Sequence, residues 1–315
     1  MKSPVSSKRG KSLRAQTSFQ SFRRKYVWIF FVGPAVVVLL GIVIFPLIFS
    51  LSLSLHEWNI IKANGWNWTG LGNYAMILFM DPYFRTSLKV TFLYLVGTVP
   101  VQFALGLAVA LILYRISRRI IGFLRTSLVF PSIMTPIVVG IIWRLMYNPD
   151  MGMLNYFLGL LGLPPVNWTG SPLTALPSIM MADIWEWTPF MALILLAGLQ
   201  ALPKEPYEAA VVDGASPGQV LRYITLPLLS PVMIVAILIR LMDSFKTFDL
   251  IFVLTEGGPG MSTEILNYYT YRYGFKFFHM GYASALSWLL VVMVTIIALI
   301  LIRTIRSRGL YAAGG

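Results

Sequence analysis

Two apolar stretches of this 315-residue chain contain ionisable side chains whose spacing could serve to bind a polar molecule. The stretch 174–200 contains Asp183 and Glu186 on either side of Trp185. The stretch 228–255 contains alternating basic and acidic residues at every third position: Arg240, Asp243, Lys246 and Asp249. Carboxylates and ammonium groups can hydrogen-bond to hydroxyls, and aromatic rings can cover apolar faces of a ligand. These residue types therefore indicate binding chemistry.

A polar connection between the same two stretches, 201–227, has a second distinctive spacing. Glu208 complements the positive end of a short helix, and Gly214 can end that helix because glycine readily takes a positive φ. Pro217 is typical of the first turn of a second helix, which we expect to end at Pro227. Small side chains on the first helix could form a docking surface for another protein: Ala209, Ala210 and Val212. An ordinary connector between two helices is the alternative.

The composition indicates that these residues belong to a membrane protein. The chain is 57% hydrophobic and only 12% charged, and its mean hydropathy is +0.74. About a quarter of the residues in soluble proteins are charged. Six stretches are long and apolar enough to cross a bilayer, which takes about 20 residues each: 27–55, 88–114, 120–147, 174–200, 228–255 and 282–303. The predicted fold class is an all-α polytopic membrane protein with six transmembrane helices.

The positive charges orient these spans. Of the 25 Lys and Arg residues, seventeen lie in the two tails and in the connections on their side of the membrane. The positive-inside rule then places the N- and C-termini in the cytoplasm. The expected domains are a basic cytoplasmic tail over 1–26, a transmembrane domain over 27–303 and a second tail over 304–315. The net charge of +13 is explained by this topology, so we expect no nucleic-acid partner.

An ionisable group within a span costs about 2.5–3.5 kcal/mol and normally faces protein or a water-filled cavity. We therefore expect part of the charged row to line a hydrated path for a solute, with Asp243 and Glu186 near the middle of their spans. The candidate substrate-path residues are Asp243, Lys246, Glu186 and Trp185. Neighbours three residues apart can also pair along a helix. A structural ladder of charges against another membrane subunit therefore remains the alternative.

The connection resembles a known loop. Glu-Ala-Ala, three residues, Gly, nine residues and Ile-x-Leu-Pro form the pattern found in membrane subunits of binding-protein-dependent ABC importers. The sequence is similar at every fixed position: Glu208, Ala209, Ala210, Gly214, Ile224, Leu226 and Pro227. Glycine-containing elements at 70–74 and 254–259 resemble the carbohydrate-uptake branch, the maltose and glycerol-phosphate type. Glu256 stands where that branch commonly has glycine.

The resemblance implies a permease subunit that forms a translocation pore with a second, homologous permease. It implies a cytoplasmic ABC ATPase dimer that binds the 201–227 loop, an extracytoplasmic solute-binding protein and a carbohydrate-type solute. The loop residues named above would couple ATP hydrolysis on the separate ATPase to movement of the pore. The expected location is the inner or plasma membrane of a bacterial or archaeal cell, which the chain crosses several times.

The sequence contains no pattern for a covalent reaction. Its two histidines, His56 and His279, lie far apart in the chain, and it has no cysteine. A phosphate-binding loop is also missing, since Val5 stands where the glycine five positions before Gly10 would be required. We therefore expect no enzyme activity, no metal and no cofactor in this chain. A stand-alone secondary carrier or channel for a small polar solute remains the alternative function, since it would keep the charged row without needing the docking loop.

Overall fold

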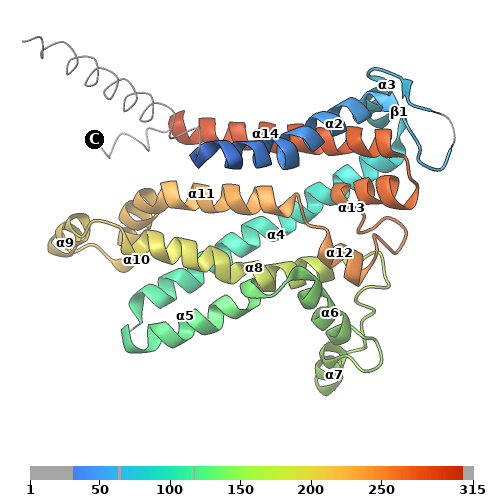
Figure 1. Cartoon of the computed structure of the whole chain (residues 1–315). Coiled ribbons are helices and arrows are strands. Elements are labelled where there is room, and N and C mark those ends of the chain that lie inside the picture. Colours follow the sequence, from blue (N-terminus) through green and yellow to red (C-terminus); the bar gives the residue numbers. More distant parts are fainter. Residues whose placement is uncertain (1–30, 63–64, 117, 308–315) are drawn as a thin grey trace, which may run out of the picture.

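The computed structural model describes residues 31–62, 65–116 and 118–307, and within this part the chain is almost entirely helical. Figure 1 shows long helices lying side by side, with short helices and loops at the two ends of the bundle. The helices are α2 (Phe45–Ser54), α3 (Gly72–Ala75), α4 (Pro82–Arg115), α5 (Arg118–Ile133), α6 (Pro136–Met146), α7 (Met153–Leu160), α8 (Ala175–Gln200), α9 (Glu205–Val212), α10 (Pro217–Val220), α11 (Leu226–Ser244), α12 (Asp249–Leu254), α13 (Leu266–Tyr271) and α14 (Met280–Ser307).

Four short π-helical turns and one hairpin complete the described structure. The π-turns are η1 (Leu40–Ile44), η2 (Met76–Met80), η3 (Leu221–Thr225) and η4 (Arg272–Lys276). The strands β1 (His56–Glu57) and β2 (Asn67–Trp68) pair antiparallel, with His56 opposite Trp68. The fold is therefore all-α, as the sequence predicts.

Five helices are long and apolar enough to cross a membrane, and a bent pair of helices makes a sixth span. The five are Phe31–Ser54, Pro82–Arg115, Ala175–Gln200, Pro217–Ser244 and Met280–Arg303. The predicted six spans are thus confirmed by length and composition. The predicted basic tail 1–26 lies outside the described residues. Within the second predicted tail, 304–315, α14 continues to Ser307.

The third predicted span, 120–147, is not one straight helix. It divides into Thr126–Ile133 and Pro136–Met146, which meet at an angle of 95°. Thr135 between them is extended, with φ −71° and ψ 140°. A residue before proline is disfavoured in the helical region, so Pro136 forces this break and then begins α6.

The fifth predicted span, 228–255, also differs. Its helix begins at Pro217 and ends at Ser244, and the chain leaves the helix before α12 begins at Asp249. Lys246 and Asp249 therefore do not continue a charge ladder along one helix. Asp243 lies at the end of α11 and not near the middle of its span, whereas Glu186 is close to the middle of α8.

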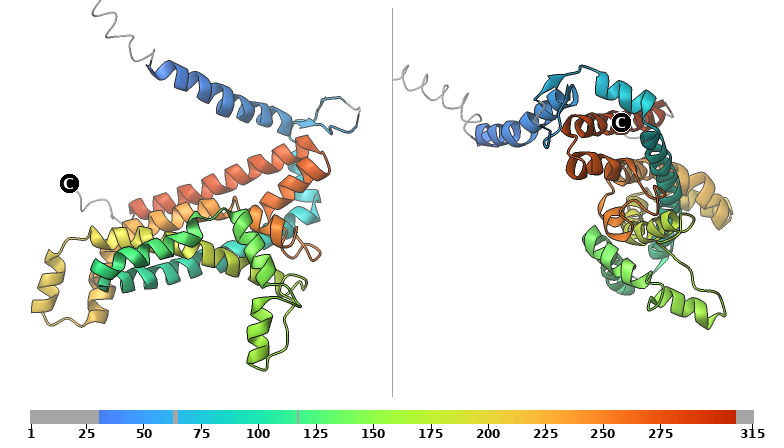
Figure 2. Two further views of the ribbon diagram at one scale, coloured as in Figure 1. Left: turned by 60° about the horizontal axis from the view of Figure 1, so that its bottom comes forward. Right: turned by 90° about the vertical axis from the view of Figure 1, so that its right-hand side faces the viewer.

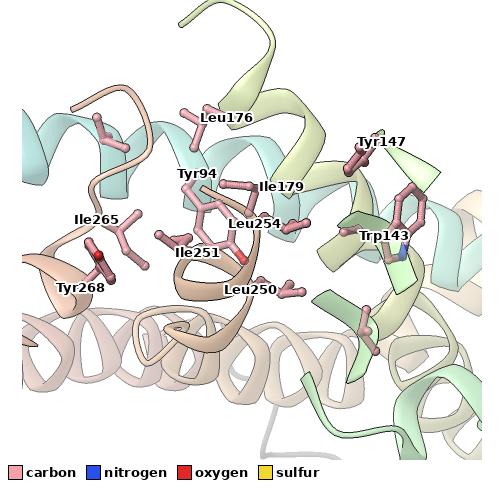
Figure 3. Close-up of a cluster of buried hydrophobic side chains, with 13 residues drawn as sticks. Tyr94, Trp143, Tyr147, Leu176, Ile179, Leu250, Ile251, Leu254, Ile265 and Tyr268 are labelled. Atoms are coloured by element: carbon pink, nitrogen blue, oxygen red, sulfur yellow. The ribbon is translucent and has the colours of Figure 1, made fainter. Parts of the chain in front are cut away.

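The core consists of three apolar clusters that hold the spans together. The cluster in Figure 3 joins α4, α6, α8, α12 and α13, and its labelled side chains include Tyr94, Trp143, Ile179 and Leu250. A second joins α4, α8 and α11, and a third joins α4, α13 and α14. The first span is different, because only 6% of its most apolar window is buried. It packs against α14, and Figure 2 shows it diverging from the bundle.

Candidate functional site

Three spans meet at a buried cluster of polar side chains. Arg240 on α11 donates from Nη2 to both carboxylate oxygens of Asp183 on α8, at 2.7 and 2.6 Å. Its Nε donates to the side-chain oxygen of Gln102 on α4 at 2.8 Å, and the Gln102 amide donates to Asp183 Oδ2 at 2.8 Å. All three residues are at most 1% exposed. Arg240 and Asp183 thus neutralise each other, and Gln102 hydrogen-bonds to both, as charges buried within a span require.

Arg240 also connects this cluster to the candidate path. Its Nη1 donates to Asp243 Oδ2 at 3.0 Å, and its guanidinium lies 4.8 Å from the centre of the Trp187 ring. The Asp243 side chain is 42% exposed, so its carboxylate contacts the buried cluster on one side and the exposed surface of α11 on the other. Arg240–Asp243 is the one pair of the predicted charge ladder that forms along the helix within the described residues.

Glu186 lies beside this cluster with an unsatisfied carboxylate. It is 1% exposed, and its Oε2 atom has no hydrogen-bond partner among the described residues. A buried carboxylate oxygen without a donor is costly, so it marks a position where a bound molecule can supply one. The backbone oxygen of Glu186 is satisfied, because Ser132 Oγ donates to it at 2.7 Å.

A cavity of about 120 Å³ separates Glu186 from the break after α11. Its polar lining comes from α8, the end of α11, the first residue of α12 and the break between α11 and α12: Asp183, Glu186, Asp243, Lys246, Thr247 and Asp249. Trp187, Pro136, Phe248 and Leu250 complete its wall. A water molecule occupies about 30 Å³ in the liquid, so the cavity has room for a few waters or for hydroxyl groups of a solute.

The structure brings together three of the four predicted path residues. Asp243, Lys246 and Glu186 line the cavity. Trp185 does not, because successive helical residues point about 100° apart and its ring packs edge-on against Trp143, at 6.0 Å. Trp187 is the aromatic residue that lines the cavity instead. Trp185 therefore lies outside this cavity, and its place in the path stays a prediction.

Sequence reasoning missed Gln102. It is fully buried in α4, where it holds both Asp183 and Arg240. Its signal was an amide side chain in the apolar stretch 88–114, since a polar residue within a span needs a buried partner. The partner itself could not be identified, because it lies 81 residues away on α8.

The predicted docking loop forms at the opposite end of the bundle from α3, α12 and α13 (Figure 1). Glu205 begins α9, and Gly214 follows it with a φ of +71°. Ser216 then caps α10 in a capping box with Gln219, directly before Pro217. The predicted helix–glycine–helix arrangement is confirmed.

The second helix of this loop does not end at Pro227. A π-turn, η3, precedes α11, and its wider i→i+5 hydrogen bonding continues the helix from Pro217 into the span. Pro227 occupies the first turn after the π-turn, where a missing N–H is tolerated. The loop is therefore joined to α11 without an interruption, so a force on the loop can reach the span directly.

The two halves of the loop enclose a shallow pocket of about 390 Å³. Ala209, Ala210, Gly214 and Ile224 lie in its wall, whereas Glu208 is exposed beside it. Ala210 is buried and not exposed as predicted, and Val212 is 87% exposed. Leu226 and Pro227 belong to α11. The Tyr207 hydroxyl donates to Thr225 Oγ1 at 3.2 Å, which ties α9 to the end of η3.

The opposite end of the bundle has a loop at 255–264 that is held by internal hydrogen bonds, such as the one from Thr263 to Gly258 O at 2.8 Å. Glu256 has a φ of +50° where the resemblance would place glycine, and Lys276 donates to its carboxylate at 3.2 Å. Hydrogen bonds from this lysine to Glu256 and Tyr268 raise the pKa of Lys276. Burial raises the pKa of the Glu264 carboxyl, against the opposing effect of Arg272, which contacts it at 2.6 Å.

The sequence model of a family described as the binding-protein-dependent transport system inner membrane component matches residues 102–308. The match includes the buried polar cluster and the whole docking loop. The chain belongs to this family. It is therefore a multi-pass membrane permease subunit of a transport system.

Related permeases cover nearly the whole chain. It is 41% identical over 275 residues to the probable ABC transporter permease protein y4oQ of Sinorhizobium fredii, covering 86% of this chain and 87% of the relative. It is 37% identical over 294 residues to the trehalose/maltose transport system permease protein MalF of Thermococcus litoralis, covering 93% of this chain and 98% of the relative. It is 36% identical to the trehalose transport system permease protein SugA of Mycobacterium tuberculosis, covering 90% of this chain and 89% of the relative.

A solved structure supports the fold of this permease. A chain of a bacterial ABC transporter that imports the acidic polysaccharide alginate superposes with a TM-score of 0.80 at 22% identity. The superposition covers 92% of this permease and 99% of that chain. The bent third span and the interrupted fifth span therefore occur in a chain whose overall fold is that of a solved ABC transporter subunit.

Proposed function

We propose that this permease forms half of the translocation pore of an ATP-driven importer for a carbohydrate or a related polyol or glycoside. Three relatives support the solute class, since their names refer to trehalose, to trehalose and maltose, and to sulfoquinovosyl glycerol. A second, homologous permease forms the other half of the pore, and an extracytoplasmic solute-binding protein delivers the solute. This assignment favours an importer subunit over a stand-alone carrier.

The docking loop of the permease binds a cytoplasmic ABC ATPase. The observation that supports this role is the uninterrupted helix from Pro217 to Ser244, which begins at the loop and ends beside Asp243. Glu208, Val211 and Val212 are exposed on the short helix α9, where a partner can reach them. ATP-driven closure of two ATPase subunits would move this helix and with it the polar cavity at its far end.

The solute passes the cavity lined by Glu186, Asp243 and Lys246. Glu186 supplies an acceptor without a donor, Lys246 supplies donors, and Trp187 supplies a flat apolar face. The cavity volume of about 120 Å³ is well below the 300–1,000 Å³ of ordinary small-molecule sites. A sugar therefore passes only when α8 and the end of α11 move apart, so the cavity acts as a closed constriction in this conformation.

Reconstitution of the four-component importer in liposomes tests the proposed function. Trehalose, maltose and sulfoquinovosyl glycerol are the probes, and at least one should accumulate only when ATP and the binding protein are both present. Uptake by the permease alone without ATP would overturn the proposal in favour of the stand-alone carrier.

Asp243→Asn tests the path within the same assay. We expect uptake to fall at least about tenfold, which corresponds to about 1.4 kcal/mol, because the half-exposed carboxylate is replaced by an amide that lacks its charge. The complex should still assemble, since Asp183 and Gln102 continue to hold Arg240. Asp150→Asn, in the exposed connection after α6, is the matched control. Unchanged uptake in Asp243→Asn would show that this residue lies outside the path.

A further inference from the structure

A groove that the function assigned so far does not use lies between α13, η4 and the first turns of α14. Its volume is about 410 Å³, which is within the range of small-molecule sites and more than three times that of the Glu186 cavity. Phe248 lines both the groove and the cavity, so the two spaces are neighbours across one side chain. The groove is therefore placed next to the proposed path.

Three aromatic rings form a continuous surface along the groove. Phe248 contacts Tyr271 edge to face, with ring centres 4.9 Å apart. Tyr271 stacks on Phe275, with centres 5.5 Å apart and planes at 25°. Phe275 is 64% exposed, so one face of the row remains open. The stacked pair Tyr271–Phe275, with Phe248 edge-on at its end, is suited to a ligand with a flat apolar face.

Polar atoms with unused hydrogen-bonding capacity lie along the same groove. The Asn267 amide nitrogen donates to the Lys246 backbone oxygen at 2.7 Å, which orients the side chain and leaves its oxygen without a donor among the described residues. Thr270 donates to Leu266 O at 2.8 Å and keeps its oxygen lone pairs free. The Ser284 hydroxyl lines the groove and has no hydrogen bond within the described part of the chain.

The charge of the groove distinguishes it from the cavity. Its lining contains hydroxyl, amide, aromatic and small side chains, and none of its side chains is an acid, a lysine or an arginine. Anionic ligands normally need arginine, lysine or a helix N-terminus to compensate their charge. A neutral polyhydroxylated ring fits this lining of rings, hydroxyls and an amide without a cation.

We propose that the groove formed by Phe248, Tyr271 and Phe275, with Asn267, Thr270 and Ser284, is a subsite for a neutral sugar ring next to the Glu186 constriction. This inference rests on the proposed function, because it assumes that the solute is a carbohydrate. A pyranose stacks one face on the aromatic row and hydrogen-bonds through its hydroxyls to the amide and hydroxyl oxygens. The sugar then waits in the groove while the neighbouring constriction is closed.

A single cysteine tests the subsite, because the natural chain has none. Ser284→Cys introduces a thiol of nearly the same size within the groove, and Phe79→Cys introduces one at an exposed position outside it. Both variants are assembled into the complete importer and treated with a water-soluble maleimide, and labelling of this chain is measured after separation of the subunits. The added sugar is whichever of trehalose, maltose and sulfoquinovosyl glycerol the importer takes up with ATP.

A neutral disaccharide should slow labelling at Ser284→Cys about tenfold at ten times its dissociation constant, and should leave Phe79→Cys unchanged. Labelling that sugar does not slow, in an importer that transports it, would overturn the subsite while the proposed function stands. Failure of Ser284→Cys to react in the importer, with reaction in the isolated chain, would instead make the groove an interface with the second permease. Selective uptake of the anionic sulfoquinovosyl glycerol would also contradict a neutral-sugar subsite.

Phe275→Ala and Phe275→Tyr give a second, independent measurement. Alanine removes the open stacking surface, so sugar protection of the Ser284→Cys thiol should be lost, whereas tyrosine should retain it. Phe275 is largely exposed, so neither change should disturb folding. Full protection in Phe275→Ala would exclude aromatic stacking as the basis of the subsite.

Discussion

At the residue scale, Arg240 determines how three spans are held together. Its guanidinium contacts Asp183 on α8, Gln102 on α4 and Asp243 on its own helix. A buried ion pair gains little over an apolar pair of the same shape, but a buried charge without its partner is strongly destabilising. The arrangement therefore favours one way of docking the helices, since any other packing would leave a charge unpaired.

The pairing of Arg240 with Asp183 predicts that removing Arg240 alone lowers the stability of the protein more than replacing both residues together. Arg240→Met should destabilise the protein by about 3–5 kcal/mol, because the Asp183 carboxylate loses the buried cation that pairs with it. Arg240→Met combined with Asp183→Asn should recover a substantial part of this loss. The thermal unfolding midpoint of the purified importer measures both. A double variant that unfolds as early as the single one would show that charge pairing is not the cause.

The residues of this cluster could be predicted only in part. Asp183, Glu186 and Arg240 stand out as charges in apolar stretches, and burial explains why such charges are rare. Their partners depend on the rotation and depth of each helix, which one sequence does not specify. Trp185 was grouped with Glu186 because they are adjacent, yet the helix directs the two side chains to different surroundings.

At the element scale, the docking loop is where local sequence and structure agree best. Gly214, Ser216 and Pro217 have backbone or capping roles that depend on a few neighbours, so they could be predicted from the sequence. The π-turn η3 could not, because it depends on how α11 packs after the loop. The expected helix end at Pro227 is wrong for that reason, and the single span predicted over 120–147 is broken at Pro136.

The positive φ of Gly214 allows a prediction that separates conformation from bulk. A Cβ at this position would meet no atom within 4 Å, so only the φ of +71° limits substitution. Gly214→Asn should retain most ATP-driven uptake, because asparagine tolerates this conformation, whereas the β-branched side chain in Gly214→Val should abolish most of it. Uptake per ATP hydrolysed in proteoliposomes measures the coupling.

The amount of permease in the membrane is the control for this loop experiment. Both variants should insert and assemble to the wild-type level, because Gly214 lies outside the buried clusters. If Gly214→Val transports as well as Gly214→Asn, the helix–glycine–helix geometry is not required for coupling.

At the scale of the whole molecule, the close approach of α4 and α8 places the cavity and the cluster in one position. Glycines permit this approach. A Cβ on Gly106 would lie 2.7 Å from Met191 Cβ and 3.1 Å from the Ala192 nitrogen, both held by the α8 backbone. A Cβ on Gly97, in the same pair of helices, would instead meet the flexible end of Met180, with the nearest atom Sδ at 2.7 Å.

These two glycines should therefore respond differently to the same change. Gly106→Ala should destabilise the protein by about 1–3 kcal/mol, because the two helices must separate, whereas Gly97→Ala should cost less because the Met180 side chain can rotate away. Gly159→Ala in α7, where no atom lies within 4 Å, should be neutral or slightly stabilising. Thermal unfolding of the three variants in the assembled importer gives the ranking.

Since Gln102 lies one turn before Gly106 and holds Asp183, separation of the helices should also weaken ATP-driven uptake in Gly106→Ala alone. Equal stability of Gly106→Ala and Gly97→Ala would mean that the α4–α8 contact adjusts freely and does not fix the position of the site.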